Sequence, residues 1–299
     1  MPPLHPFTSS MSSPVYILGS NGFIGSHLLR HLQSRMFGCE VRGLGINDID
    51  LTLESAVQQL VALLPKSARL VILSGVKRQL GDSFGSFEKN IQIATTLSRV
   101  IERSKPEKVI FFSSAAVYGE ETHNLAIAEQ TPVNPITCYG ISKFASERVL
   151  SIAAKNAGSS IVMLRPPVIY GPFDASNSYG PVAFCRSAKK GNAIELWGDG
   201  SELREFVYVD DCCRIIESLL GSKFSGVLNL ACGKSHSFRD IIDCIAQLIG
   251  KNLDVIEKPR SKEKVDNRFD SSLMNAINPN FQWTDLQSGI NQTWQDVTL

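Results

Sequence analysis

Long apolar runs and clusters of charge of one sign are both missing from this 299-residue chain. A membrane-spanning helix needs about 20 consecutive apolar residues, and no stretch of the sequence approaches that length. The formal net charge is only +1, from 30 basic and 29 acidic residues. No run of Lys or Arg provides the basic patch that nucleic-acid binding requires. We therefore expect neither a membrane nor a nucleic acid as a partner.

Paired cysteines are lacking as well. The seven cysteines are scattered and none forms a C-x-x-C pair, which is typical of free thiols in a reducing compartment. The five histidines show no metal-ligand spacing. Residues 1–13 are rich in Pro and Ser without an apolar core, so they do not resemble a secretory signal and we expect a disordered leader. These features predict a cytoplasmic protein without a bound metal.

What the sequence does contain is a regular alternation of short apolar runs and amphipathic segments. Apolar runs typical of buried strands lie at 15–18, 40–44, 70–73, 109–112 and 160–164. Helical spacing of apolar residues lies between them, over 23–32, 53–64, 91–101 and 139–154. This order is typical of a parallel sheet with helices on both faces. We therefore predict the α/β class with a Rossmann doubly wound parallel sheet.

A glycine-rich turn follows the first predicted strand. Gly19, Gly22 and Gly25 form a G-x-x-G-x-x-G run that ends this strand and opens an amphipathic helix. Small residues let the backbone approach a pyrophosphate, which the free N–H groups and partial positive charge of the helix N-terminus attract. The run predicts a dinucleotide site, whose members we expect to be Gly19, Asn21, Gly22, Phe23, Ile24 and Gly25.

The second predicted strand lacks the acid that usually follows it and binds the hydroxyls of the adenosine ribose. Arg42 and glycines stand there instead. Arg42 either meets the 2′-phosphate of NADP or is an ordinary surface charge. Asp50 either lies near the adenine or belongs to the N-cap region of the next helix. The cofactor is therefore NADP or NAD, and Arg42 favours NADP.

The composition changes after Pro167. Gly, Pro, Ser and Asn are frequent over 171–181, which is typical of a loop. We expect residues 14–170 to form the dinucleotide-binding domain. Residues 171–299 would form a smaller C-terminal substrate-binding lobe, with a segment near 205–230 returning to the main sheet.

Tyr139 and Lys143 are four residues apart, so on a helix they share one face. A free tyrosine has a pKa of about 10 and is a poor base at neutral pH, but a neighbouring ammonium favours the phenolate. Such a pair can exchange a proton with a hydroxyl or carbonyl while a hydride moves to or from nicotinamide. Ser114 follows the predicted strand at 109–112, at the edge where ligands bind in open α/β sheets. It can hydrogen-bond the reacting oxygen, while Ser113 satisfies backbone groups.

These residues resemble the extended short-chain dehydrogenase/reductase family of nucleotide-sugar epimerases, dehydratases and reductases. The matching segments cover nearly the whole chain after Ser13: 19–25, 113–119, Tyr139 with Lys143, 165–172, 198–200, 204–211 and Asp270. The resemblance implies Ser114, Tyr139 and Lys143 as the catalytic set, with Lys143 also holding the nicotinamide ribose.

The resemblance also implies residues around the ligands. Pro166 would contact the cofactor, and Arg204 would bind the phosphates of a nucleotide sugar. Asn177 would lie in a loop that lines the nucleotide pocket. Asn90 is either an active-site helix residue or a simple polar residue of a helix face. Helices over 91–101 and 139–154 pair two subunits in such proteins, so a homodimer is expected by analogy.

Departures from the family pattern narrow the reaction. Dehydratases carry an Asp-Glu pair where this chain has Ala115 and Ala116, so the acid and base for dehydration are missing. The stretches near Arg204 and Asn177 look like GDP-fucose synthases, but the Cys and His used there for 3,5-epimerisation are absent near Ala116 and Tyr179. Of the reactions in this family, hydride transfer at a single carbon, C4, is the one that the sequence still supports.

Three functions are consistent with this site. The missing acid after the second strand and the short link to the next helix favour a nucleotide-sugar 4-ketoreductase. The alternative is a C4 epimerase of the UDP-glucose 4-epimerase type, which must hold NAD throughout its cycle. The third is a non-catalytic NAD(P)-binding regulatory protein, which Ser114, Tyr139 and Lys143 argue against, because members of that kind often lose the Tyr or Lys.

Overall fold

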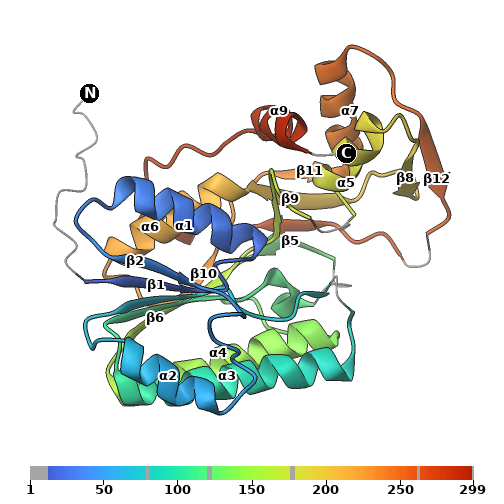
Figure 1. Cartoon of the computed structure of the whole chain (residues 1–299). Helices are drawn as coiled ribbons and strands as arrows, with labels where there is room; N and C mark the ends of the chain where they lie inside the picture. Colours follow the sequence, from blue (N-terminus) through green and yellow to red (C-terminus); the bar gives the residue numbers. More distant parts are fainter. Residues whose placement is uncertain (1–12, 79–80, 120–122, 176–178, 261–262, 298–299) are drawn as a thin grey trace.

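A parallel sheet forms the centre of the chain (Figure 1). The computed structural model describes residues 13–78, 81–119, 123–175, 179–260 and 263–297, and within them six strands lie in the order β10-β6-β4-β3-β1-β2. Their bounds are β1 (Val15–Leu18), β2 (Val41–Leu44), β3 (Arg69–Ile72), β4 (Lys108–Phe112), β6 (Ser160–Arg165) and β10 (Gly226–Asn229). All their pairings are parallel, so the predicted α/β class with a doubly wound parallel sheet is confirmed.

Helices cover both faces of this sheet (Figure 1). On one face lie α1 (Phe23–Arg35) and α6 (Val209–Gly221), and on the other lie α2 (Ser55–Leu63), α3 (Phe84–Ser104) and α4 (Cys138–Ala157). The sequence of β1 explains why both faces need cover. Val15 and Ile17 belong to the core beneath α1 and α6, whereas Tyr16 and Leu18 belong to the opposite core, because neighbouring side chains of a strand point to opposite faces.

The helix predicted over 91–101 is longer than its apolar spacing indicated. The structure begins α3 at Phe84, where the Ser83 hydroxyl accepts a hydrogen bond from the backbone N–H of Ser86 at 3.2 Å. Residues 84–89 are exposed or only partly buried, so this first stretch adds no residue to the buried face of the helix. This stretch, which includes the exposed Phe84, therefore lengthens the helix from a serine N-cap without changing its buried face.

The rest of the chain forms a smaller lobe beside the carboxyl edge of the main sheet (Figure 1). Its strands pair in three groups: β7 (Val168–Tyr170), β9 (Leu203–Tyr208) and β11 (Ser235–Ser237); β8 (Ile194–Trp197) and β12 (Val255–Lys258); β5 (Asn124–Ile127) and β13 (Asn267–Phe269). Its helices are α5 (Pro181–Lys189), α7 (Phe238–Ile249) and α9 (Leu286–Asp296). Of the segment near 205–230, β9 lies in the lobe and β10 in the main sheet.

Two short helices lie beside strands of the main sheet. The 3-10 helix η2 (Ala115–Tyr118) follows β4, and α8 (Ser272–Ile277) packs beside β10 through the buried Met274.

The core of the lobe contains a cluster of aromatic side chains in contact: Tyr179, Phe184, Phe206 and Phe238.

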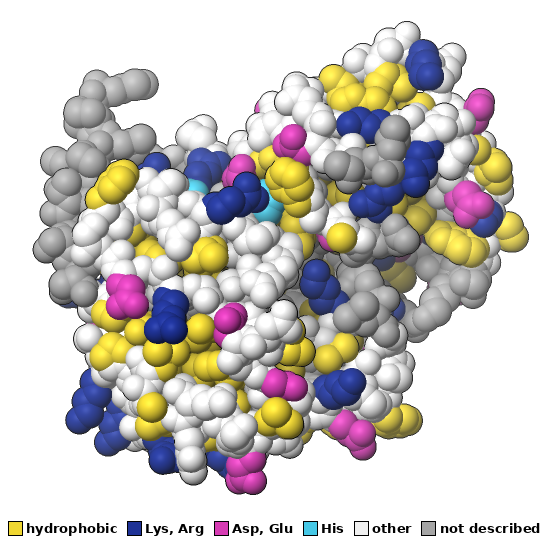
Figure 2. All heavy atoms as spheres, in the orientation of Figure 1, with side chains coloured by type: hydrophobic (Ala, Val, Ile, Leu, Met, Phe, Trp, Pro, Cys, Tyr) yellow, Lys and Arg dark blue, Asp and Glu magenta, His cyan; other side chains and the backbone are white. Residues whose placement is uncertain are grey.

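The distribution of charge on the surface agrees with the nearly equal numbers of basic and acidic residues. Over the body that holds the main sheet, basic and acidic side chains are interspersed in the view of Figure 2. Within the described residues, no helix is both long and apolar enough to cross a membrane, and no cluster of three or more His, Cys, Asp or Glu could hold a metal ion. All seven cysteines are free thiols.

Candidate active site

The main sheet reverses its winding direction between β1 and β3. The chain passes from β1 to β2 on one side and then crosses to β3 on the other side of β1, and ligands of open α/β sheets bind at such a point. Gly19 closes β1 there with φ of +88°, and a Cβ on it would lie 2.8 Å from the backbone nitrogen of Ser74 just beyond β3. Glycine is therefore required where the ends of the two strands meet.

The glycine turn fits a pyrophosphate. A Cβ on Gly25 would lie 2.2 Å from the Gly19 carbonyl oxygen, so this glycine lets α1 pack directly on the end of β1. Gly22 is the N-cap of α1, no described side chain caps this helix, and its first turn holds no acid. The first-turn N–H groups and the helix dipole are therefore suited to an anion. These features fit the diphosphate of a dinucleotide.

Arg42 and Asp50 occupy different surroundings from the glycine turn. Arg42 lies inside β2, in register with Tyr16 and two residues before the strand ends at Leu44, and its side chain is exposed. Asp50 accepts hydrogen bonds from the backbone N–H and the hydroxyl of Thr52, at 2.9 and 2.7 Å. These bonds hold the pKa of the Asp50 carboxyl below its usual value, which is the behaviour of a turn residue that stabilises the approach to α2.

Tyr139 and Lys143 lie in the first turns of α4, which Thr137 caps. Lys143 is only 7% exposed, and its Nζ donates to the Phe112 carbonyl oxygen at 2.7 Å. Nζ also lies 5.8 Å from the centroid of the Tyr139 ring. Burial lowers the pKa of Lys143 to about 8, and the Glu147 carboxylate opposes this effect. The structure therefore brings the phenol and the ammonium together.

Three successive residues at the end of β4 have separate tasks. The Phe112 carbonyl binds Lys143, and the buried Ser113 hydroxyl donates to Glu147 at 2.5 Å. The next residue, Ser114, lines a cavity. Its Oγ accepts the Ala116 N–H at 3.1 Å, which leaves the hydroxyl proton for another acceptor. Ser114 is therefore oriented as a donor.

Glu147 lies one turn beyond Lys143 and forms a buried ion pair with Arg165. The two bonds are 2.9 and 2.6 Å long, and both side chains are about 4% exposed. Burial would penalise the guanidinium, but the Glu147 carboxylate more than offsets this and raises the pKa of Arg165. This pair fixes α4 to the end of β6, and the Ser113 bond joins the same carboxylate to the end of β4.

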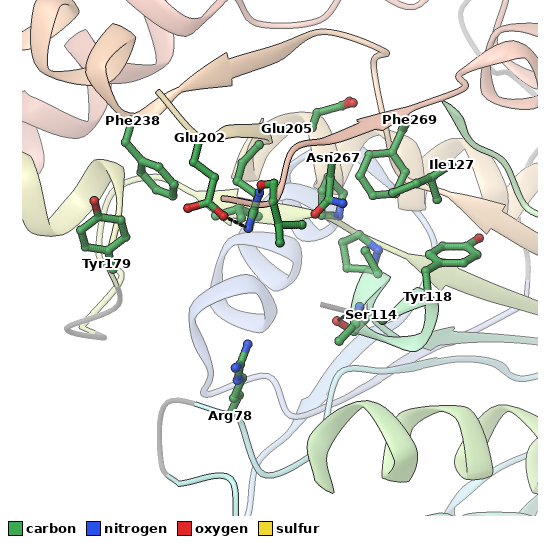
Figure 3. A pocket seen from close by; sticks show the side chains of 18 of the residues that line it. Arg78, Ser114, Tyr118, Ile127, Tyr179, Glu202, Glu205, Phe238, Asn267 and Phe269 are labelled. Atoms are coloured by element: carbon green, nitrogen blue, oxygen red, sulfur yellow. Dashed lines mark hydrogen bonds and ion pairs between the residues drawn. The ribbon is translucent and has the colours of Figure 1, made fainter. Parts of the chain in front are cut away.

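A cavity of about 610 Å³ lies between the main sheet and the lobe. In Figure 3, Ser114 and Arg78 point into it from the main-sheet side, and Glu202 and Phe238 from the lobe. Pro166 lines it as well, and its carbonyl accepts the Ala115 N–H at 2.9 Å.

Tyr139 and Lys143 are not among the residues that line the cavity. Gly140, however, packs on its wall, since a Cβ there would lie 2.8 Å from the Ala116 carbonyl oxygen. The tyrosine therefore lies beside the wall that carries Ser114.

The lobe end of the cavity carries two arginines. Arg204 donates to the Leu203 carbonyl at 2.8 Å, to the Val265 carbonyl and to the Glu202 carboxylate. Arg260 binds the same carboxylate at 3.3 Å and Asp199 at 3.1 Å. Two guanidinium groups thus meet two carboxylates here, and their planar N–H groups are donors of the kind that suit a phosphate.

Most of the expected residues gather at this edge, and some lie elsewhere. The glycine turn with Asn21, Phe23 and Ile24 lies at the β1 edge, and Ser114, Pro166 and Arg204 line the cavity. Arg42 lies within β2, and Asn177 falls outside the described residues. Asn90 is buried and clamps the loop after β3, because it accepts the Val76 N–H at 2.7 Å and donates to Ser142 at 3.2 Å.

Sequence reasoning missed several residues of the site. Arg78 and Arg260 lie on loops between elements, where no periodicity distinguishes a site residue from a surface charge. Glu202 follows the Gly198-Asp199-Gly200 turn and could have been identified only through its pairing with Arg204. Glu147 could have been found, because it lies four residues after Lys143 on the same helix face.

Comparisons with known proteins agree with this geometry. The family model described as NAD dependent epimerase/dehydratase family matches residues 15–231. The chain is 26% identical to a putative UDP-glucose 4-epimerase of Methanocaldococcus jannaschii, over 83% of this chain and 87% of the relative. It is 25% identical to a GDP-L-fucose synthase of Sinorhizobium fredii, over 81% of this chain and 82% of the relative.

A solved structure extends the likeness to three dimensions. The complex of UDP-glucose 4-epimerase from Thermus thermophilus with NAD superposes with a TM-score of 0.81 at 26% identity, covering 95% of this chain and 98% of that one. The resemblance inferred from the sequence is thereby confirmed. The chain belongs to the NAD-dependent epimerase/dehydratase family and is an enzyme.

Proposed function

We propose that this enzyme moves a hydride at C4 of a nucleotide sugar and acts as a C4 epimerase with NAD. One observation carries the proposal: the buried Lys143 ammonium lies 5.8 Å from the Tyr139 ring, next to the strand end whose Ser114 lines the cavity. Such a set suits proton exchange at a carbinol oxygen. The nicotinamide of bound NAD supplies the acceptor, and then the donor, of the hydride.

The protein groups would divide the work as follows. The Tyr139 oxygen takes the proton from the C4 hydroxyl, and the Lys143 charge supports the phenolate that does so. Ser114, whose Oγ already accepts the Ala116 N–H, keeps its proton and donates a hydrogen bond to the reacting oxygen. The same groups work in reverse when the 4-keto sugar is reduced on its other face.

The nucleotide would lie toward the lobe. Arg204 and Arg260 line that end of the cavity, and both are planar donors that match phosphate oxygens. The sugar would then extend toward Ser114 at the opposite wall. The cavity volume of about 610 Å³ is in the range of pockets that hold small ligands.

A 4-ketoreductase is the second candidate. The sequence favoured it because no acid directly follows the second strand, and the likeness to a GDP-L-fucose synthase supports it. The structure weakens the first reason, because the Asp48 carboxylate lies at the end of β2. The likeness to a putative UDP-glucose 4-epimerase and to an NAD complex of such an enzyme favours epimerisation.

The test is to incubate the purified protein with UDP-glucose, UDP-glucuronate and UDP-N-acetylglucosamine without added cofactor, and to follow the sugars by NMR. Interconversion of C4 epimers, with NAD retained in native mass spectrometry, is expected. Tyr139→Phe and Ser114→Ala should lower the rate at least about a hundredfold. Reduction of a 4-keto sugar with stoichiometric consumption of cofactor would establish the reductase instead. Full activity of Tyr139→Phe would refute the catalytic assignment.

A further inference from the structure

The carboxylate of Glu202 lies at the lobe end of the cavity, and Figure 3 shows it pointing into the cavity. Its Oε1 accepts a hydrogen bond from Nη2 of Arg204, and its Oε2 accepts one from Nη1 of Arg260 at 3.3 Å. Both oxygens therefore bind the guanidinium groups that the proposed function assigns to the phosphates. Asp199 binds Arg260 as well, so two negative charges already balance the two positive ones in the free protein.

Each guanidinium group has a second anchor that does not involve Glu202. Nη1 of Arg204 donates to two backbone carbonyl oxygens. Nη2 of Arg260 donates to the Asp199 carboxylate at 3.1 Å. The Arg260 side chain also lies against Gly198, where a Cβ would be 2.2 Å from the arginine Nε. Both guanidinium groups would therefore keep their places if the Glu202 carboxylate moved away.

Glu202 is the member of this network that is free to move. Among the described residues, its side chain has no hydrogen-bond or ion-pair partner besides the two arginines. The backbone beside it is held, because the N–H of Leu203, the first residue of β9, donates to the Asp266 carboxylate at 2.8 Å. A rotation of the Glu202 side chain would therefore uncover the arginines without disturbing β9.

We propose that Glu202 competes with the substrate diphosphate: it covers Arg204 and Arg260 in the free protein, and the phosphates of the nucleotide sugar displace it. The inference deepens the proposed function and rests on it, because it takes the lobe end to hold the nucleotide. A diphosphate carries more negative charge than one carboxylate and offers oxygens to both guanidinium groups, so it can replace Glu202 there. The covered state lowers the apparent affinity, because only molecules with uncovered arginines are ready to bind.

A purely structural role of Glu202 predicts the opposite effect on binding. If the carboxylate only positioned the arginines, Glu202→Gln would leave them less well placed and would weaken nucleotide binding. If the carboxylate competes, Glu202→Gln removes the competing charge while keeping a side chain of the same size, and binding becomes tighter. The direction of the change in affinity therefore distinguishes the two roles.

The experiment titrates the full chain with UDP, and separately with GDP, by calorimetry in saturating NAD, so that the dinucleotide site is occupied. Glu202→Gln should bind the better of the two nucleotides about tenfold more tightly than the wild type does. Without nucleotide its melting temperature should be lower, because the arginines lose a partner, and the rise on adding nucleotide should be larger. As the control, Glu257→Gln removes the same charge from a pair with Arg239, whose members are not among the residues that line the cavity. It should bind nucleotide as the wild type does.

The outcomes separate this inference from the proposed function. Equal or weaker binding by a folded Glu202→Gln would overturn the inference alone, because the nucleotide would still bind. If neither protein bound UDP or GDP, the nucleotide site itself would be refuted, and both proposals with it. In an Arg204→Ala background the gain from Glu202→Gln should shrink, because one of the two uncovered guanidinium groups is absent. An undiminished gain there would show that Glu202 does not act through the arginines, and would also overturn the inference.

Discussion

Lys143 holds its charge where little water reaches it. Its side chain is 7% exposed, and its Nζ donates to a neutral carbonyl rather than to a carboxylate. Burial therefore lowers its pKa to about 8. A buried ammonium costs stability at neutral pH, and at this position the charge supports the phenolate of Tyr139.

The charge of Lys143 should limit activity on the alkaline side. As pH rises through about 8, Lys143 loses its proton and with it the support for the Tyr139 phenolate. We expect kcat/KM to fall with a midpoint near pH 8, measured as a pH profile with saturating cofactor. Lys143→Met should abolish turnover yet unfold at the same or a higher temperature at pH 7, because it removes a desolvated charge.

Lys155→Met, at the exposed end of the same helix, is the control and should keep the profile of the wild type. A wild-type activity that stays level to pH 10 would contradict the role given to the Lys143 ammonium.

Glu205 carries a second buried charge. It is fully buried, and its Oε1 accepts the N–H groups of Cys232 and Gly233. Its Oε2 has no described partner. Burial raises its pKa to about 7. The folded state then holds the proton more tightly than the unfolded chain, so stability falls as pH rises from about 4.5 to 7 and levels off above that.

Glu205→Gln should remove this dependence. It keeps an oxygen for the two N–H groups but cannot ionise, so it should be more stable than the wild type at pH 8 by about 3 kcal/mol at most. Urea unfolding at pH 5 and pH 8 measures the difference, with the exposed Glu88→Gln as control. Equal pH dependence of wild type and Glu205→Gln would show that Glu205 does not titrate in this window.

At the scale of elements, the catalytic groups depend on the contact between the end of β4 and α4. Glu147 joins the two, because it binds Ser113 and forms the buried pair with Arg165. Breaking a buried pair from one side leaves the other charge without its partner, and this usually costs more than the pair itself contributes.

We therefore expect Glu147→Gln to lower the free energy of unfolding by about 3 kcal/mol and to lower kcat, because Ser114 and Lys143 would lose their common anchor. Urea unfolding and steady-state kinetics measure the two effects. Glu217→Gln is the matched control on α6. Its pairs with His31 and Arg35 are more exposed, so its cost should stay below about 1 kcal/mol. Similar losses in both variants would contradict the anchoring role.

The elements also show what the sequence can and cannot predict. Local patterns indicated two features, the turn at Gly19 and the pairing of Tyr139 with Lys143. Each depends only on residues a few positions apart in the sequence. The order of the strands depends on long-range pairing, and the cavity residue Arg260 comes from a loop without periodicity. The acid at the end of β2 was missed because Asp48 reaches its place only by turning back to bind the Gly45 N–H.

At the scale of the whole molecule, the site lies between two separately packed parts. Ser114 belongs to the body and Arg204 to the lobe, and both line the same cavity. A nucleotide sugar that spans the cavity would contact both parts. The proposed reaction therefore depends on how the lobe is held against the body, to which the bond between His27 and the Pro172 carbonyl, just after β7, contributes.

The outer face of α4 leads to a prediction about assembly. Ile141, Val149 and Ile152 are 42%, 37% and 59% exposed there, and apolar groups on a helix face are typical of an interface. We expect a homodimer through α3 and α4. Light scattering after gel filtration should give twice the chain mass, and Ile152→Glu should give a monomer. Ile256→Glu, on an exposed part of β12, should stay dimeric, and a wild-type monomer at micromolar concentration would contradict the interface.

The tight spacing at the end of β4 limits how this protein can change over evolution. Phe112, Ser113 and Ser114 each meet a different partner. A deletion or insertion of one residue here would therefore place each group in the position of its neighbour. The hydroxyl meant for the sugar would face the helix, and the anchoring hydroxyl would face the cavity. Relatives can therefore exchange side chains in this stretch, but its length should be as invariant as any catalytic residue.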